Sequence, residues 1–231
     1  LAMLKRRQTV RTSTFSKKEG NRMLPISVNL QNKKCIVIGG GKVASRRIQT
    51  LLAEGANVTV ISPELLPELM ILVEDQHIKW FRRPFDDGDC LGAFLVIAAT
   101  NRKAVNERVA YDCRQNQLLN IVDNPEKSNF YFPAVGRKGL LSIAVSTGGA
   151  SPVLAKNIRD RVMEQFDDEF EQYVAFVKEA RALILSMKLE ERTKRTLLNE
   201  LIDNRLLSKA EQIQFLSRIH EQDNVLSAER K

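Results

Sequence analysis

The sequence predicts an α/β protein whose first domain is a Rossmann-type parallel sheet. Three features of the 231-residue chain predict this fold class. A glycine-rich turn lies between a short apolar run and a helical pattern, and short β-branched runs then alternate with helical stretches. Two extended segments and a long helical tail follow. We therefore expect a Rossmann domain over residues 23–125, a small β dimerisation region over residues 126–147, and an α-helical domain over residues 148–231.

The glycine-rich turn directly follows the apolar run at residues 36–38. Gly39 allows a tight turn, Gly41 lets the backbone approach a pyrophosphate, and Ala44 is small enough for close packing of helix on strand. The unpaired amides and the dipole at the helix N-terminus favour an anion. The turn with Gly39, Gly40 and Gly41 therefore indicates a dinucleotide site, and a plain structural turn is the alternative.

The segment after this unit bears on which dinucleotide binds. The first helix is expected to end at Gly55, and a strand is expected over residues 57–61. A Rossmann fold places an acidic residue for the ribose about 20 residues past the glycines, but the chain has Ser62, Pro63 and Glu64 there. Ser62 and Pro63 either contact the ribose or merely begin a loop. No Arg follows at once, which favours NAD over NADP.

The following elements alternate as a doubly wound sheet requires. The continuous apolar run before Thr100 is typical of a parallel strand that is buried on both faces. Ligands bind beyond the carboxyl ends of such strands, so Thr100, Asn101 and Asp123 are expected together beside the cofactor. We expect helices over residues 65–74 and 105–116, and strands over residues 77–81, 93–100 and 119–123.

The pattern changes after residue 128. Extended segments at residues 129–135 and 139–146 are joined by a short connection at residues 136–138, which predicts a hairpin. A hairpin outside the nucleotide fold exposes apolar edges, and this one is therefore expected to form a dimer interface.

The remainder of the chain has helical periodicity. Ser151 is a good N-cap, and Pro152 suits the first helical position. An apolar stripe over residues 166–184 predicts a helix that faces a core. Ser208 and Glu211 have the spacing of a capping box ahead of a last helix.

The location of the positive charge argues against a nucleic-acid partner. The net charge is +8, but residues 1–22 contain seven Lys or Arg and one Glu, so this segment accounts for +6. The rest of the chain holds only about +2 and has no basic recognition helix. We interpret residues 1–22 as a disordered basic extension or an upstream artefact, with a targeting presequence as the alternative.

The cysteine, histidine and apolar content restrict the setting of the protein. Three widely spaced cysteines predict neither a disulfide framework nor a CxxC site and favour a reducing, cytoplasmic location. Only two histidines are present, so no resident metal is expected. No apolar run approaches the roughly 20 residues of a membrane span, and no membrane association is expected.

Four segments together carry a more specific signal. They are VIGGGKVASRR with GANVTVISPE, then AATN, then NIVDNPEKSNFYFPA, and last STGGASPVLAK. In this combination the chain resembles the bacterial precorrin-2 dehydrogenases, which oxidise precorrin-2 to sirohydrochlorin in sirohaem synthesis. The similarity runs from about Met23 to at least Val162. It implies an NAD-linked homodimer whose active site lies in a cleft between a Rossmann domain and a helical domain that forms the tetrapyrrole pocket.

The resemblance also implies roles for particular residues. Asp123 falls on the family's catalytic aspartate. The cofactor-binding residues are the turn of Gly39, Gly40, Gly41, Lys42 and Val43, with Ser62 and Pro63, and the loop of Thr100 and Asn101. The substrate-binding residues are Asn124, Thr147, Gly148, Gly149 and Ser151.

The expected reaction needs a base and several cations. Precorrin-2 loses one hydrogen as a hydride to the nicotinamide and the other as a proton, which Asp123 is expected to accept. An exposed aspartate at the reference pKa of about 3.9 is a weak base, so we expect this carboxylate to be buried. The alternative is that Asp123 only initiates a turn. The cations placed to bind substrate carboxylates are Arg46, Arg47, Arg137, Lys138, Lys156 and Arg159.

Two alternative functions stay open at this point. One is a bifunctional dehydrogenase and ferrochelatase, in which Asp123 accepts pyrrole protons or helps to coordinate the incoming Fe²⁺. The other is a non-catalytic, NAD-binding dimer that acts as a regulatory module.

Overall fold

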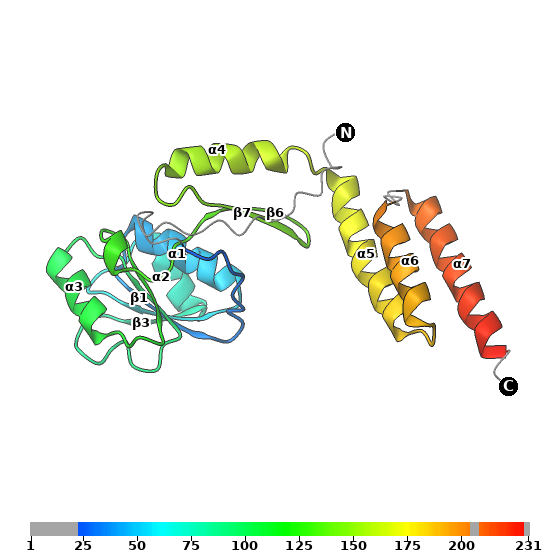
Figure 1. Cartoon of the computed structure of the whole chain (residues 1–231). Coiled ribbons are helices and arrows are strands. Elements are labelled where there is room, and N and C mark those ends of the chain that lie inside the picture. The colour runs from blue at the N-terminus through cyan, green and yellow to red at the C-terminus, as the bar shows by residue number, and fades with distance from the viewer. Residues whose placement is uncertain (1–22, 204–207, 229–231) are drawn as a thin grey trace, which may run out of the picture. The chain divides into compact units, whose positions relative to one another are not determined.

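The computed structural model describes residues 23–203 and 208–228, so the interpretation of residues 1–22 lies outside the described part. The chain divides into two compact units between Tyr131 and Phe132. The first unit contains a five-stranded sheet with helices, and the second contains a two-stranded hairpin followed by four helices (Figure 1).

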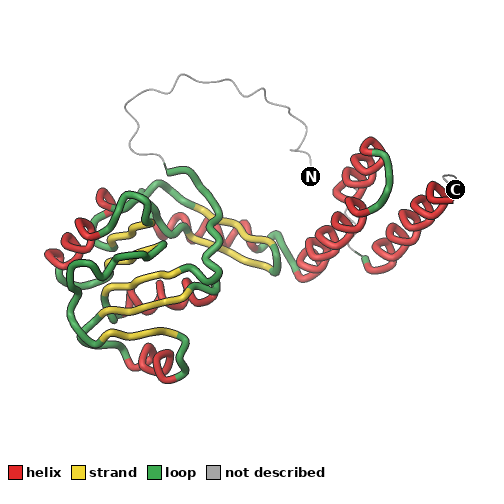
Figure 2. The backbone as a smooth tube through the Cα atoms, turned by 90° about the horizontal axis from the view of Figure 1, so that it is seen from below, coloured by secondary structure: helices red, strands yellow, loops and turns green. Residues whose placement is uncertain are grey.

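The first unit is the predicted parallel sheet, with the strand order β3-β2-β1-β4-β5 (Figure 2). Each neighbouring pair of strands is parallel, so all five carboxyl ends lie at the same edge. The direction of the chain across the sheet reverses between β1 and β4, which is where such folds bind their ligands. The strands are β1 (Lys34–Ile38), β2 (Asn57–Ile61), β3 (Ile78–Phe81), β4 (Leu95–Ala98) and β5 (Leu118–Ile121).

Helices cover both faces of this sheet (Figure 1). α1 (Lys42–Ala53) and α2 (Pro67–Glu74) share one face, and α3 (Lys103–Asp112) lies on the other. The core under α3 includes Val96 of β4 and Val109 of α3, both fully buried. Burial of both faces explains why the strands are nearly continuous apolar runs.

The second unit begins with an antiparallel pair, β6 (Ala134–Lys138) and β7 (Leu141–Val145). α4 (Pro152–Met163) packs against both strands. The Ser151 hydroxyl accepts a hydrogen bond from Leu154 N at 3.2 Å, which confirms the predicted N-cap.

The predicted connection at residues 136–138 is wrong, because these residues continue β6. The turn lies at Gly139 and Leu140, where Gly139 has the positive φ of 51° that a tight turn requires. Gly136 serves packing instead, since an added Cβ there would lie 2.4 Å from Cγ of Met163. The glycine that sequence analysis assigned to the turn therefore allows α4 to approach the hairpin.

The helical tail is divided into three further helices, α5 (Asp168–Ser186), α6 (Glu191–Asp203) and α7 (Lys209–Ala228). α5 packs against α6 and α7, and the buried aromatic residues Tyr173 and Phe176 lie in their shared core. The capping box ahead of α7 is confirmed, because Ser208 N donates to Oε2 of Glu211 at 3.1 Å and Glu211 N donates to the Ser208 hydroxyl at 3.3 Å.

Candidate functional site at the carboxyl edge of the sheet

Two of the three glycines between β1 and α1 are required by the protein's own backbone. Gly39 N donates to Ile61 O at the end of β2 at 2.9 Å, which closes the turn onto the sheet. An added Cβ at Gly39 would lie 2.5 Å from Ala99 O, and one at Gly40 would lie 2.2 Å from Glu64 O. Side chains at these positions would displace the backbone that follows β4 and β2, so Gly39 and Gly40 shape the turn.

Gly41 differs from its two neighbours because it faces open space. It is the N-cap of α1, no side chain caps the helix there, and an added Cβ would meet no atom within 4 Å. Ser45 N donates to Gly41 O at 2.9 Å, so the helix begins immediately after this residue. The amides of Lys42 and Val43 therefore lie at the positive end of the α1 dipole, beside a bare Cα. This open helix N-terminus fits the pyrophosphate of a dinucleotide.

Ser62 and Pro63 form the start of the loop after β2. The Ser62 side chain is buried, and its hydroxyl donates to Glu64 O at 2.7 Å. Its carbonyl accepts a hydrogen bond from Nε1 of Trp80 at 2.9 Å. Both groups thus stabilise the loop, as the structural alternative anticipated, while a ribose contact at Ser62 stays a prediction. Pro63 and Glu64 are exposed beside it.

The loop after β4 is organised by a residue that sequence analysis did not select. β4 ends at Ala98, so Thr100 and Asn101 lie beyond the strand, and Asn101 is exposed. The Thr100 hydroxyl lies 2.7 Å from Oδ1 of Asn106 and Thr100 N donates to the same oxygen at 3.3 Å. Nδ2 of Asn106 donates to Thr100 O at 3.1 Å. Three hydrogen bonds therefore join one buried amide on α3 to the predicted cofactor loop.

The same amide reaches the predicted base. β5 ends at Ile121, and Asp123 lies two residues beyond it, where Nδ2 of Asn106 donates to Oδ1 of Asp123 at 2.9 Å. The Asp123 side chain is exposed, so the burial that we expected of a base is not found in the first unit. Asn124 has a local role, because its side chain accepts a hydrogen bond from Lys127 N at 3.3 Å and caps the short helix η1 (Pro125–Lys127).

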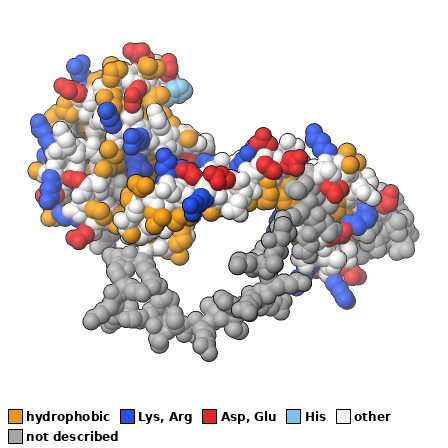
Figure 3. Space-filling model, turned by 90° about the horizontal axis from the view of Figure 1, so that it is seen from above, with side chains coloured by type: hydrophobic (Ala, Val, Ile, Leu, Met, Phe, Trp, Pro, Cys, Tyr) orange, Lys and Arg blue, Asp and Glu red, His pale blue; other side chains and the backbone are white. Residues whose placement is uncertain are grey.

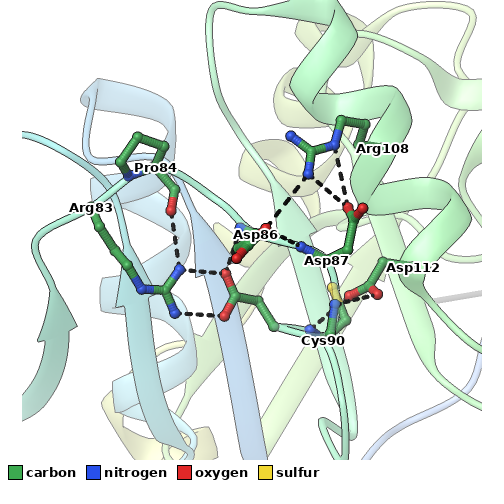
Figure 4. A network of polar contacts seen from close by, with 9 residues as sticks. Arg83, Pro84, Asp86, Asp87, Cys90, Arg108 and Asp112 are labelled. Atoms are coloured by element: carbon green, nitrogen blue, oxygen red, sulfur yellow. Dashed lines mark hydrogen bonds and ion pairs between the residues drawn. The ribbon is translucent and has the colours of Figure 1, made fainter.

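The helix that holds Asn106 is fixed to the loop between β3 and β4 (Figure 4). Arg108 forms an ion pair with Asp87 at 2.8 Å. The carboxylate of Asp112 accepts hydrogen bonds from Gly88 N at 2.7 Å and Cys90 N at 2.9 Å. These contacts attach α3 at two points along its length, so the position of Asn106 relative to the sheet is well determined.

Within the same loop, Arg83 and Asp89 form a bidentate pair with both oxygens at 2.7 Å (Figure 4). The hydrogen bond from Arg83 lowers the pKa of Asp89, and the bond from Asp86 N adds to the effect. The pair is structural, because it ties the start of the loop to its middle.

The predicted substrate loop belongs to the second unit. The Thr147 hydroxyl accepts a hydrogen bond from Ser151 N at 3.1 Å and donates to Ser151 O at 3.0 Å, which closes the turn before α4. Gly148 and Gly149 have positive φ values of 62° and 86°, and added Cβ atoms would meet nothing within 4 Å. The turn is therefore open on its glycine side, while Thr147 and Ser151 hold its ends together.

Several of the cations considered for substrate binding are already paired. Lys138 forms an ion pair with Asp168 at 2.6 Å, and Arg159 pairs with Asp160. Burial lowers the pKa of Arg47, and the neighbouring Arg46 adds to the shift. On the face shown in Figure 3, basic and acidic side chains are interspersed over both units.

Two further observations concern metals and membranes. Within residues 23–203 and 208–228, no three His, Cys, Asp or Glu side chains are grouped to hold a metal ion. None of the helices in the described part of the chain is long and apolar enough to cross a membrane.

Three family models match consecutive parts of the chain. A model for NAD(P)-binding proteins matches residues 26–134. A model for the central part of sirohaem biosynthesis proteins matches residues 138–165, and a model for the SirC C-terminal domain matches residues 170–215.

Individual relatives agree with these models. The precorrin-2 dehydrogenase of Bacillus subtilis (strain 168) is 39% identical over 148 residues, which are 64% of this chain and 91% of that protein. The precorrin-2 dehydrogenase of Priestia megaterium is 34% identical over 198 residues, which are 85% of this chain and 98% of that protein. A solved structure, "SirC, precorrin-2 dehydrogenase", is 34% identical with a TM-score of 0.76 and covers 86% of this chain and 100% of its own.

Proposed function

The chain belongs to the precorrin-2 dehydrogenase family, and we propose that it oxidises precorrin-2 to sirohydrochlorin in sirohaem synthesis with NAD⁺ as the hydride acceptor. The observation that supports this function best is the arrangement at one sheet edge. An open helix N-terminus at Gly41 and the carboxylate of Asp123 lie beyond the carboxyl ends of β1 and β5, the two parallel strands that flank β4. This edge provides an anion site for a dinucleotide and a proton acceptor for the substrate.

The residues of the first unit divide the reaction between them. The amides at the start of α1 hold the pyrophosphate, and the loop of Thr100 and Asn101 contacts the cofactor. The bound dinucleotide supplies the hydride acceptor. Asp123 receives the proton that leaves precorrin-2 together with that hydride, through the carboxylate that Asn106 orients. The Thr147 to Ser151 turn belongs to the second unit, and its proposed role is to contact the substrate.

NAD⁺ is proposed rather than NADP⁺ because of the loop after β2. The chain has Ser62, Pro63 and Glu64 there, and the exposed Glu64 would repel a 2′-phosphate. The comparison of NAD⁺ with NADP⁺ at equal concentration tests this choice, and a lower KM for NADP⁺ would contradict it.

We propose that the protein acts as a homodimer in the cytoplasm. The support is the hairpin of β6 and β7, in which no residue is fully buried, and α4, which exposes Val153 and Leu154. The three cysteines are free thiols, as the cytoplasm would keep them. Sedimentation of the full chain tests the dimer, and a monomer at micromolar concentration would contradict it.

The decisive experiment is an anaerobic assay of precorrin-2 with NAD⁺, followed through the spectrum of sirohydrochlorin. Asp123→Asn should abolish oxidation and leave NADH affinity within a few-fold of wild type, because the change keeps the size and the hydrogen bond acceptor. Asp75→Asn, an exposed carboxylate at the end of α2, is the matched control and should retain full activity. Activity in Asp123→Asn would show that another group accepts the proton.

The same assay with Fe²⁺ added separates the remaining functions. Sirohydrochlorin that persists in the presence of Fe²⁺ supports a dehydrogenase alone, and catalysed conversion to sirohaem would show a second, chelatase activity. A chain that binds NADH but leaves precorrin-2 unchanged would contradict the proposed function and favour a regulatory module.

A further inference from the structure

We propose that Asn106 is a positioning residue that joins the predicted cofactor loop at Thr100 and the carboxylate of Asp123 into one hydrogen-bonded group. The inference rests on the proposed function, because it assigns Asp123 the role of the proton acceptor. It adds a residue from α3 that the motifs of the chain did not indicate. Asn106 is only 1% exposed, so it acts through its neighbours and does not itself contact the substrate.

The amide of Asn106 uses its full hydrogen-bonding capacity. Its two N–H groups donate to Thr100 O at 3.1 Å and to Oδ1 of Asp123 at 2.9 Å. Its oxygen accepts from Thr100 N at 3.3 Å and lies 2.7 Å from the Thr100 hydroxyl. An amide offers two donors and two acceptor lone pairs, so this side chain is saturated and its orientation is fixed by four contacts.

The four contacts span two strand ends of the sheet. Thr100 follows β4 and Asp123 follows β5, and these strands are hydrogen-bonded neighbours. Asn106 bonds directly to both loops, to Thr100 after β4 and to Asp123 after β5. The amide therefore sets where the Asp123 carboxylate points relative to the loop that contacts the cofactor.

The orientation of the carboxylate follows from which oxygen is engaged. Oδ1 of Asp123 accepts the bond from Asn106, and among the described residues Asn106 is the donor that this carboxylate contacts. The other oxygen is left to receive a proton. A general base needs this geometry, because proton transfer requires the acceptor oxygen within hydrogen-bonding reach of the leaving proton.

Two substitutions separate the two sides of the amide. Asn106→Ala removes all four contacts. Asn106→Asp keeps an oxygen for Thr100 N and the Thr100 hydroxyl. It removes both N–H groups, so Thr100 O loses its donor and Oδ1 of Asp123 faces a second negative charge. The first variant should disturb both the cofactor loop and the base. The second keeps two of the three bonds to the loop, so it should disturb the base more than the loop.

These contacts predict how each variant changes kcat, NADH affinity and the pH–rate profile. Asn106→Ala should lower kcat by about 10–100-fold, the usual cost of misplacing a catalytic group, and weaken NADH binding by roughly fivefold. Asn106→Asp should lower kcat to a similar extent and weaken NADH binding less than Asn106→Ala does, because two of the three bonds to the loop remain. It should also move the acid limb of the pH–rate profile to higher pH, because a neighbouring like charge disfavours ionisation of a carboxylate.

Gln117→Ala is the matched control. Gln117 is also a buried amide of the first unit, and Nε2 donates to Cys90 O at 2.6 Å and Ala93 O at 2.8 Å. It precedes β5, at the opposite edge of the sheet from Asp123. Its removal should lower the thermal unfolding temperature as much as Asn106→Ala does, with kcat and the pH profile unchanged within about twofold.

The positioning role of Asn106 and the proposed function can fail independently of each other. Wild-type kcat in Asn106→Ala, or an equal loss of kcat in Gln117→Ala, would overturn the positioning role. If the wild-type chain does not oxidise precorrin-2, the proposed function fails. The NADH titration of wild type and Asn106→Ala still tests whether Asn106 holds the cofactor loop. Equal NADH affinity in wild type and Asn106→Ala would then overturn the inference on its own.

Discussion

Changing each of the three consecutive glycines of the turn to alanine should affect the protein in a different way. Gly39→Ala and Gly40→Ala should destabilise the fold, whereas Gly41→Ala should leave the fold intact and weaken the binding of the cofactor. The difference follows from what an added Cβ meets: backbone oxygen of Ala99 at 2.5 Å, backbone oxygen of Glu64 at 2.2 Å, and open space.

The magnitudes follow from these distances. At Gly39 the φ of +117° costs an alanine about 1–2 kcal/mol, and displacing the backbone after β4 costs about 1–3 kcal/mol more. A loss of roughly 2–5 kcal/mol lowers the unfolding temperature by more than about 10 °C in a unit of this size. At Gly41 the less favourable N-cap costs about 0.5–1 kcal/mol, and the reduced freedom of the unfolded chain returns about as much. The unfolding temperature of the Gly41→Ala variant should therefore differ from that of wild type by only a few degrees.

Of the three variants, Gly41→Ala should have the largest direct effect on cofactor binding, although it has the smallest effect on stability. A methyl group on Gly41 occupies the space beside the first amides of α1 and prevents at least one charge-assisted hydrogen bond, worth about 1.5–3 kcal/mol. NADH affinity should fall by at least about tenfold. Trp80 is the only tryptophan, and its indole bonds to Ser62 O at the same sheet edge, so energy transfer from it to NADH reports binding.

Gly88→Ala is the matched control for the backbone angle. Gly88 has a φ of +94° but no atom within 4 Å of an added Cβ, so it measures the cost of φ without a steric clash. Wild-type NADH affinity in Gly41→Ala would refute the placement of the pyrophosphate at this turn. A Gly39→Ala variant no less stable than Gly88→Ala would refute the contact with Ala99.

Two further predictions concern ionisable groups. Because the Arg83 hydrogen bond lowers the pKa of Asp89, this carboxylate stabilises the fold above the unfolded value near 3.9, and the contribution is lost as pH falls through the lower folded value. Asp89→Asn should thus cost about 1 kcal/mol in urea unfolding at pH 7, and this cost should shrink as the pH falls below the unfolded value. Glu107→Gln, from a solvent-exposed pair with Lys127 at 3.9 Å, should cost nothing at any pH. A difference for Asp89→Asn that stays constant with pH would contradict the assignment. Burial raises the pKa of Cys35 to about 11, and a hydrogen bond from Cys90 lowers that of the half-buried Cys113, so iodoacetamide at pH 8 should label Cys113 first in the native protein. Peptide mapping that finds Cys35 labelled at the same rate would disprove this order.

The sequence was informative wherever structure depends on neighbours in the chain. All five sheet strands follow from short apolar runs bounded by turn residues, and their parallel order placed Thr100, Asn101 and Asp123 at one edge. The capping groups at Ser151 and Ser208 are equally local. The hairpin turn was misplaced because a glycine required for helix packing, at position 136, resembles a glycine required for a turn.

Asn106 could not be found in this way, because its role depends on contacts between distant segments. Within the helical pattern it is one polar residue between Val105 and Glu107, and asparagine is merely a weak helix former there. Its partners lie 6 and 17 residues away, at two different strand ends. Only the rotation of α3 on the sheet shows that its amide faces them. A buried asparagine inside a predicted helix was the one available signal, and it specifies no partner.

The order of the strands explains why the proposed cofactor site and the proposed base have a fixed relation. Gly39 N bonds to the end of β2, and Ala99 N bonds to Ile38 O at the end of β1 at 2.8 Å, so the glycine turn and the loop after β4 are parts of one backbone network. Asn106 extends that network from Thr100 to Asp123 after β5. The geometry between pyrophosphate and base is therefore set by sheet register and one buried amide, both within the first unit. The side chains of Thr147 and Ser151 bond within their own turn, so a substitution there should act on the KM for precorrin-2 and leave NADH affinity unchanged, as titration of each variant would show.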